Sequence, residues 1–171
     1  MQNNNNSISC SENLYAATKE AFKTIINFYQ EKNNTKFYNL YLGDTYSKND
    51  KRKKILPTLR MNYYNNKKTI LISKKLTMNL THVSDVINAI NILVKKNIKQ
   101  GNYQIYSKKT ENIYKLIKNF NNINKKKIKF LLLNKKFQLN KYYKFKKVPT
   151  WKEKNLIKKQ FNKIIHDNQK K

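Results

Sequence analysis

The segment Asn13-Leu-Tyr-Ala-Ala-Thr-Lys-Glu-Ala-Phe22 opens the first strongly periodic part of the chain. Its apolar residues and those that follow recur at the three- and four-residue spacing of one helix face: Leu14, Ala17, Ala21, Phe22, Ile25, Ile26 and Tyr29. The spacing predicts a single helix over residues 13–31. Tyr15 and Lys19 stand at positions i and i+4, so we expect both side chains on one face, about one turn apart.

This Tyr–Lys pair is the main candidate for chemistry. An ammonium close to a phenol favours the phenolate over the neutral form. Tyr15 could then act as a general acid/base toward a sugar hydroxyl or keto group, with Lys19 supporting it. The alternative is a chance pair, because the chain contains 12 Tyr and Lys is very common in it.

The rest of the chain alternates between short apolar runs and helical patterns. We expect strands within 37–42, 69–73, 80–82, 103–106 and 128–133, the first of them ended by Gly43. Helices are expected near 52–64 with Pro57 in the first turn, after a cap at Ser84 and Asp85, and from Thr110. Thr150 and Glu153 have the spacing of a capping box before a last amphipathic helix. Alternating strands and helices predict an α/β fold.

Length and composition limit the classes of protein that fit. The 171 residues suit one domain of ordinary size, in which we expect 1–12 to be a disordered polar terminus and 13–171 the folded part. A single Cys10 rules out a disulfide framework. No stretch approaches the roughly 20 apolar residues that cross a bilayer, and the start lacks the pattern of a signal peptide. We therefore expect a cytoplasmic protein.

The net charge of +29 raises an alternative function, that of a basic, non-enzymatic protein that binds RNA or another polyanion. Two observations weigh against it. Only Arg52 and Arg60 are arginines, although bidentate readers of phosphate and bases favour Arg. The Lys excess also accompanies high Asn, Ile and Tyr and very little Gly, Pro and Ala, a pattern that AT-rich codons explain by themselves.

Five ordered blocks of the sequence carry a resemblance to a known family. They are the Tyr-x-x-x-Lys segment at 13–22, Leu40-Tyr-Leu-Gly-Asp-Thr-Tyr46, Leu80-Thr-His-Val-Ser-Asp-Val86, Asn102-Tyr-Gln-Ile-Tyr106 and Val148-Pro-Thr-Trp151. Together they resemble the extended short-chain dehydrogenases, the family of NAD-dependent nucleotide-sugar epimerases, dehydratases and reductases. Within the family, the sequence of these blocks is most similar to that of the reductases and epimerases that make deoxysugar nucleotides for surface polysaccharide, such as CDP-abequose synthase. The sequence departs from the family pattern directly after Tyr46, where Ser47 and Lys48 replace Gly-Pro, and at the block of residues 102–106, which lacks the family's glycine.

The resemblance implies a Rossmann-type fold, NAD or NADP as cofactor and a nucleotide sugar as substrate. It implies that Tyr15 and Lys19 are catalytic and also contact the cofactor. Asp44 and Thr45 would lie near the nicotinamide and the sugar, with a simple turn as the alternative. Arg52 and Arg60 could contact substrate phosphates, with solvated surface residues as the alternative. It further implies a homodimer through the Tyr15/Lys19 helix, and we expect that helix to be partly exposed at Ala21, Phe22, Ile25 and Tyr29.

The family's Gly-rich phosphate turn has no counterpart among these residues, because the only glycines are Gly43 and Gly101. We therefore expect the chain to represent the C-terminal half of such an enzyme, inactive by itself, with a separately encoded N-terminal half as a potential partner. The remaining candidates have simpler interpretations. His82 is a structural residue with no partners for a metal, Asp85 is a charge at a helix N-terminus, and Trp151 is a core or interface aromatic.

Overall fold

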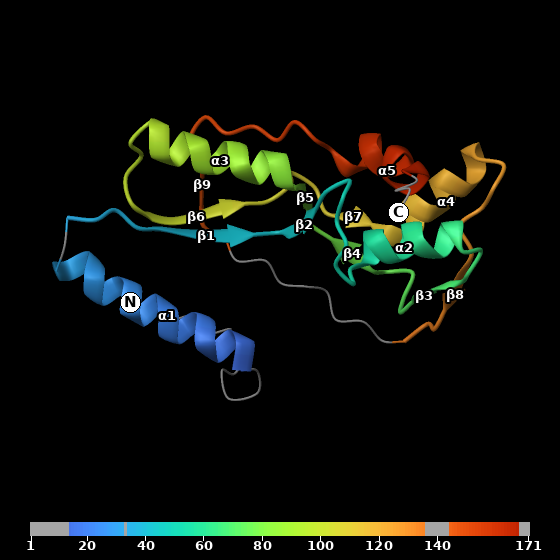
Figure 1. The fold of residues 1–171 in the computed structure, drawn as a ribbon, viewed down its shortest axis with the longest axis horizontal. Helices are drawn as coiled ribbons and strands as arrows, with labels where there is room; N and C mark the ends of the chain where they lie inside the picture. Colours follow the sequence, from blue (N-terminus) through green and yellow to red (C-terminus); the bar gives the residue numbers. More distant parts are fainter. Residues whose placement is uncertain (1–13, 33, 136–143, 168–171) are drawn as a thin grey trace. The chain divides into compact units, whose positions relative to one another are not determined.

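The computed structural model describes residues 14–32, 34–135 and 144–167 (Figure 1). Its helices are α1 (Leu14–Lys32), α2 (Ile55–Tyr64), α3 (Val83–Lys95), α4 (Ile113–Ile123) and α5 (Ile157–His166). Its strands are β1 (Tyr38–Leu42), β2 (Asp44–Tyr46), β3 (Thr69–Leu71), β4 (Thr77–Met78), β5 (Leu80–His82), β6 (Gly101–Ile105), β7 (Glu111–Asn112), β8 (Phe130–Leu132) and β9 (Lys146–Lys147). The predicted polar segment 1–12 and Cys10 lie outside the described residues.

The chain divides into two compact units. The first runs to Asn39 and contains α1, and the second runs from Leu40 to the end of the chain. Helix α1 confirms the helix predicted over 13–31 to within one residue at each end. The strands and helices predicted between 52 and 133 are also present, all in the second unit.

Most strand pairs of the structure are parallel. Strand β2 pairs with β5, β3 with β8 and β6 with β9, each in parallel register, and β1 flanks β6 in the order β1-β6-β9. The short pair β4–β7, in the part of the chain that the structure describes, is antiparallel. Parallel neighbours require crossover connections, which the intervening helices provide. The predicted α/β class is therefore confirmed.

The main hydrophobic core lies in the second unit, where α2, α4 and α5 meet the strands (Figure 1). Helix α4 buries the four residues that the sequence places on its inner face: Ile113, Leu116, Ile117 and Phe120. Helix α5 buries Ile157, Phe161, Ile164 and Ile165, as predicted, whereas Leu156 lies just outside the helix as its N-cap. Burying each of these side chains contributes about 1.5–3 kcal/mol before chain entropy is counted.

Gly43 joins β1 to β2 at a point with no room for a side chain. A Cβ there would lie 2.5 Å from the side-chain oxygen of Asn79 and 2.6 Å from its carbonyl oxygen. The same Asn79 carbonyl accepts a hydrogen bond from Asp44 N at 2.7 Å. Buried Asn79 also exchanges two hydrogen bonds with the backbone of Ser107. Only glycine permits this close approach of β2 to β5.

Two helix starts differ from the prediction. Helix α3 begins at Val83 and its cap is His82, whose ring nitrogen accepts from Ser84 N at 3.2 Å, so Ser84 and Asp85 lie inside the first turn. Helix α4 begins at Ile113 rather than Thr110, because Asn112 provides the cap by accepting from Lys115 N at 2.8 Å.

The capping box expected at Thr150 and Glu153 is also wrong. Thr150 has a φ of 60° and accepts from Lys96 Nζ, and the Glu153 carboxylate accepts from Lys108 N at 3.1 Å. Residues 151–156 remain extended or irregular, and α5 begins only at Ile157. The backbone of this segment is held instead by Asp85, as described below.

Candidate functional site

The Tyr15–Lys19 pair lies on one face of α1, as its spacing predicts. Lys19 Nζ is 5.6 Å from the centroid of the Tyr15 ring, and Tyr15 is 71% exposed. Lys19 is exposed as well. A phenol and an ammonium therefore stand side by side on an accessible surface of α1.

No residue of α1 is buried, which confirms the exposure expected for this helix. Ala21, Phe22, Ile25 and Tyr29 are all exposed, and Phe22 remains 58% accessible. Phe28 packs edge-to-face on Tyr29 with ring centroids 5.7 Å apart. The helix thus presents aromatic surface along most of its length.

The second group of candidates surrounds the loop that follows β2. Thr45 lies opposite Thr81 in the β2–β5 ladder, and its carbonyl and hydroxyl oxygens both accept from Arg52 Nη2. The same guanidinium makes a bidentate pair with the buried carboxylate of Asp50, with contacts of 2.8 and 2.6 Å. The hydrogen bond from Arg52 holds the pKa of Asp50 below its ordinary value. Asp44 begins β2 beside this loop.

Arg60 holds the same loop from α2. Its guanidinium donates to the carbonyl oxygens of Lys48 and Asp50 and lies 3.7 Å from the Asp167 carboxylate. Its side chain is 11% exposed. The structure thus brings Thr45, Arg52 and Arg60 together around the loop that follows β2. Tyr15 and Lys19 belong to the first compact unit, and these residues to the second.

At acid pH, the Asp50–Arg52 pair should no longer contribute to the free energy of unfolding. Because the pKa of Asp50 is lower in the folded state, its stabilisation is complete above the unfolded-state pKa and is lost as the pH falls through the folded-state value. We expect Asp50→Asn to lower the free energy of unfolding at pH 7 by about 1–2 kcal/mol. Urea titrations at pH 7 and pH 2.5 measure this, with Glu31→Gln as a control on an exposed carboxylate. A loss of the same size at both pH values would contradict the assignment.

Buried groups at the start of α3 organise the segment that precedes α5. Asp85, 1% exposed, accepts hydrogen bonds from Lys154 N at 3.2 Å, Asn155 N at 2.9 Å and Asn155 Nδ2 at 3.1 Å. Its own carbonyl accepts from Trp151 Nε1 at 2.9 Å. Asp85 is in the first turn of α3, as predicted, but it does more than face the helix dipole. It anchors residues 151–155.

Tyr46 and His82 complete this buried network. The Tyr46 hydroxyl donates to the carbonyl oxygen of Asn155 at 2.8 Å, and its ring meets the His82 ring edge-to-face. Burial, reinforced by the carboxylates of Glu153 and Asp85, raises the pKa of Tyr46 far above that of an ordinary phenol. Burial also lowers the pKa of His82, which keeps its ring neutral as a cap acceptor. Both residues are therefore structural, which the sequence predicts for His82.

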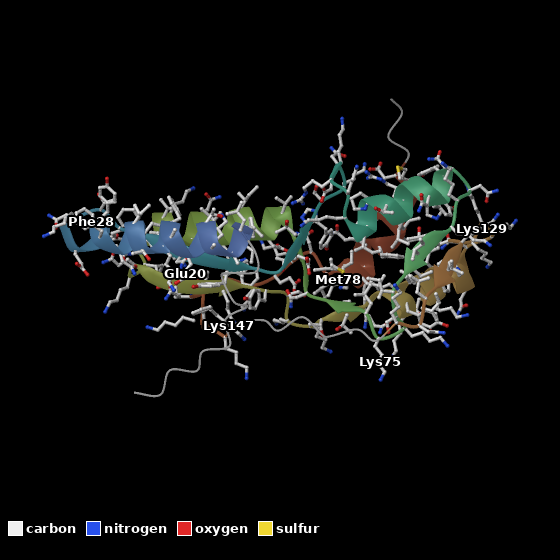
Figure 2. All side chains as sticks on the ribbon, turned by 90° about the horizontal axis from the view of Figure 1, so that it is seen from below. Glu20, Phe28, Lys75, Met78, Lys129 and Lys147 are labelled. Atoms are coloured by element: carbon white, nitrogen blue, oxygen red, sulfur yellow. The ribbon has the colours of Figure 1, made fainter. Side chains whose placement is uncertain are left out.

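A pocket that the sequence analysis does not identify lies beside α2. Its volume is about 490 Å³, and three lysines, Lys53, Lys54 and Lys68, are part of its wall. Apolar side chains from the strand side complete it, among them Ile70, Ile72 and Met78. In Figure 2, Met78 lies within the second unit, whereas Lys75 and Lys129 extend outward from it. The wall of this pocket, which is open to solvent, combines cationic groups with an apolar surface.

One signal in the sequence bears on this pocket. Leu71 is buried in β3, whereas its neighbours Ile70 and Ile72 face the other way and remain 58% and 43% exposed. These two exposed isoleucines, one in β3 and one directly after its end, mark an apolar surface without a core behind it. The rest of the wall comes from residues separated in the sequence, so spacing could not reveal it.

The described residues contain no group of three His, Cys, Asp or Glu side chains that could hold a metal ion. Among the helices that the structure describes, none is long and apolar enough to span a membrane.

Comparison with known proteins gives one family match. The model of the NAD-dependent epimerase/dehydratase family matches residues 3–107. A search of curated protein sequences gives no significant match.

Solved structures of similar fold include enzymes that are named after nucleotide sugars. A UDP-N-acetylglucosamine 4-epimerase from Methanobrevibacter ruminantium, in complex with UDP-N-acetylmuramic acid, has a TM-score of 0.67 at 13% identity, over 96% of this chain and 56% of that one. RMD from Pseudomonas aeruginosa, complexed with NADPH, has a TM-score of 0.69 at 13% identity, over 88% and 54%. A dTDP-glucose 4,6-dehydratase from Bacillus anthracis, in complex with NAD, has 0.66 at 17%, over 88% and 50%. The chain thus spans about half the length of the structures it matches.

Proposed function

Because this chain belongs to the NAD-dependent epimerase/dehydratase family, we propose that it supplies the catalytic helix and the substrate pocket of an NAD(P)-dependent enzyme acting on a nucleotide sugar. The observation that carries the proposal is the exposed Tyr15–Lys19 pair on α1, within the matched residues. More specifically, we propose from the sequence of the five blocks that the enzyme epimerises, dehydrates or reduces the nucleotide sugar on a route to a deoxysugar for surface polysaccharide.

In this proposal Tyr15 exchanges a proton with a hydroxyl or keto oxygen of the sugar. Lys19, one turn along the same face, stabilises the phenolate that forms when the Tyr15 proton leaves. The ammonium also has donors left for hydroxyl groups of a ribose. Bound NAD(P) would supply the group that accepts or returns a hydride at the sugar carbon.

The residues of this chain fit the nicotinamide ribose of such a cofactor but not its pyrophosphate. Tyr15 and Lys19 are exposed donors suited to the nicotinamide ribose, and we propose that Asp44 and Thr45 contribute near the nicotinamide. A pyrophosphate is usually seated on the backbone N–H groups of a Gly-rich turn at a helix N-terminus. Gly43, the chain's one glycine besides Gly101, is enclosed by Asn79 and Thr81 and cannot serve. We propose that a segment outside residues 1–171 provides this turn, and we call the combination the assembled enzyme.

The pocket beside α2 is proposed to hold the nucleotide of the substrate. The three lysines of its wall can neutralise a diphosphate, and Ile70, Ile72 and Met78 can cover a base. Arg52 and Arg60 are less suited to that role than the sequence alone suggests. Their guanidinium groups already bind Asp50 and backbone carbonyls of the loop after β2, so we propose that they shape the loop beside the pocket.

The chain by itself should bind UDP in this pocket. All the lining residues belong to the second unit, so no further segment is required. We expect saturable, one-to-one binding in the sub-millimolar range at about 0.3 M salt, where attraction to the net charge of +29 is screened. Replacing both Lys53 and Lys54 by Gln should weaken it about tenfold, since one or two charge-assisted contacts are lost. Isothermal titration measures both values.

Lys118→Gln is the matched control, because Lys118 is an exposed lysine of α4 that does not line the pocket. It should leave the affinity within about twofold, since it removes one charge far from any contact. An equal loss in the control and the pocket variant, or binding that follows salt alone, would contradict the pocket. It would favour the alternative of a basic protein that attracts polyanions without a built site.

A further inference from the structure

A carboxylate at the end of helix α5 contacts the loop that follows β2, which comprises residues 47–54. Asp167 directly follows α5 and is its C-cap. One of its carboxylate oxygens is 3.2 Å from Lys48 Nζ, and the other is 3.7 Å from Arg60 Nη1. The side chain of Asp167 is 14% exposed, that of Arg60 is 11% exposed and that of Lys48 is 69% exposed. The Asp167–Arg60 contact is therefore largely shielded from water.

Asp167 supplies the negative charge opposite the Arg60 guanidinium. The other carboxylate near this loop, that of Asp50, is engaged by Arg52 in a bidentate pair. Arg60 contacts Asp50 at its backbone carbonyl, 3.1 Å away. A nearly buried guanidinium that loses its counter-charge is strongly destabilised, so loss of the Asp167 charge would favour movement of Arg60 toward water. The loop carbonyls of Lys48 and Asp50 would then lose the donors that hold them.

The same loop ends in two lysines of the pocket beside α2. Lys53 and Lys54 line that pocket. Thr58 and Asn62, four positions apart on one face of α2, line it from the helix. Arg60 is two positions from each of them, on another side of α2, and does not line the pocket. The ion pair between α2 and the C-cap of α5 therefore holds the loop from outside the pocket.

We propose that Asp167 is a positioning residue for the pocket beside α2, acting through Arg60 and the loop of residues 47–54. The proposal rests on the proposed function, in which Lys53 and Lys54 bind the diphosphate of the nucleotide. Asp167 itself does not touch the ligand. It keeps the loop in the conformation in which both lysines line the pocket before a ligand arrives, so less of the chain has to become ordered on binding.

Isothermal titration of UDP into the full chain at about 0.3 M salt tests this role. Asp167→Asn keeps the shape of the side chain and removes its charge. It should weaken UDP binding about fivefold, because the loop must then become ordered when UDP binds. Asp167→Glu should restore the affinity to within about twofold, because a carboxylate that is one methylene longer can still reach both cations.

Glu20→Gln is the matched control, since it neutralises the carboxylate of another ion pair, with Lys23 at 3.1 Å, in the first unit. It changes the net charge by the same amount as Asp167→Asn and should leave the UDP affinity within about twofold.

Hydrogen–deuterium exchange of the ligand-free chain measures the loop independently of UDP. In Asp167→Asn the backbone amides of residues 47–54 should exchange at least about threefold faster than in the unaltered chain, while those of α1 should not change. In Asp167→Glu the exchange of the loop should return to its original rate.

The sign of the change in affinity is decisive. Tighter UDP binding by Asp167→Asn would overturn the proposal, because stronger attraction to the net charge, or release of Arg60 to a phosphate, gives that sign. Unchanged affinity or unchanged loop exchange, in a chain that binds UDP, would leave the proposed pocket standing and show that Asp167 does not position it. Faster loop exchange in a chain that binds no UDP would show that the pocket assignment is wrong, and the positioning role would fail with it.

Discussion

Tyr15→Phe should lower kcat of the assembled enzyme about 1,000-fold, in the middle of the range for the loss of a general acid/base. The variant keeps the ring beside Lys19 and removes only the hydroxyl that exchanges the proton. KM for the nucleotide sugar should change by less than about threefold, because the proposed substrate contacts lie in the pocket of the second unit. Steady-state kinetics with the purified assembled enzyme measures both constants.

Tyr29→Phe is the control for this experiment, since it removes a hydroxyl from another exposed tyrosine of α1. It should leave kcat unchanged. Lys19→Ala should reduce kcat as well and also weaken NAD(P) binding, because Lys19 is proposed to serve both the phenolate and the ribose. A Tyr15→Phe enzyme with full kcat would show that the pair occurs by chance.

The largest effect on stability is expected from Asp85→Asn. The substitution keeps the size of the side chain but places an amide N–H₂ against backbone and side-chain donors of Lys154 and Asn155. Asp85 is 1% exposed, so the lost charge-assisted hydrogen bonds are not replaced by water. We expect a loss of about 3 kcal/mol in the free energy of unfolding, measured by urea denaturation.

Glu31→Gln serves again as the control, because it neutralises an exposed carboxylate of α1 and should change stability by less than about 0.5 kcal/mol. The Asp85 variant should also lose the near-ultraviolet signal of Trp151, whose indole donates to the Asp85 carbonyl. A loss below 1 kcal/mol would mean that residues 151–155 are held by other contacts.

Most of the fold follows from patterns along the chain. The α/β class is predicted correctly, and so are helix α1 and the buried side of α4, because helical periodicity extends over ten residues or more in both helices. Strands β4, β7 and β9 contain two residues each and are too short to produce a pattern. They form where neighbouring elements bring the backbone into register.

The wrong boundaries share one physical cause, which is competition for the capping groups. Thr150 and Glu153 have the spacing of a capping box, yet Lys96 and Lys108 engage both side chains. Asp85 and Asn155, separated by 70 positions, hold the segment in a conformation that delays the start of α5. Contacts over such separations cannot be predicted from local spacing.

Part of the candidate site can likewise be predicted from local spacing, and part depends on contacts between distant segments. The side-by-side placement of Tyr15 and Lys19 follows from an i, i+4 spacing inside one helix. The links of Arg52 and Arg60 to the loop after β2, and the pocket beside α2, depend on how separate elements pack. The resemblance to the epimerase/dehydratase family is confirmed by the family match, whereas the roles of the individual site residues remain proposals.

The measurement that tests the central claim most directly is isothermal titration of NADPH at about 0.3 M salt, first into the 171-residue chain and then into the assembled enzyme. The account predicts no micromolar, one-to-one binding by the chain alone, because its sequence, with two glycines, contains no Gly-rich turn to seat the cofactor pyrophosphate. Weaker binding of NADPH in the lysine-lined pocket would be indifferent to Lys19. It predicts micromolar, one-to-one binding by the assembled enzyme, weakened at least tenfold in Lys19→Ala by loss of the charged ribose contact. Micromolar one-to-one binding by the chain alone, or binding by the assembled enzyme that is indifferent to Lys19, would contradict the account.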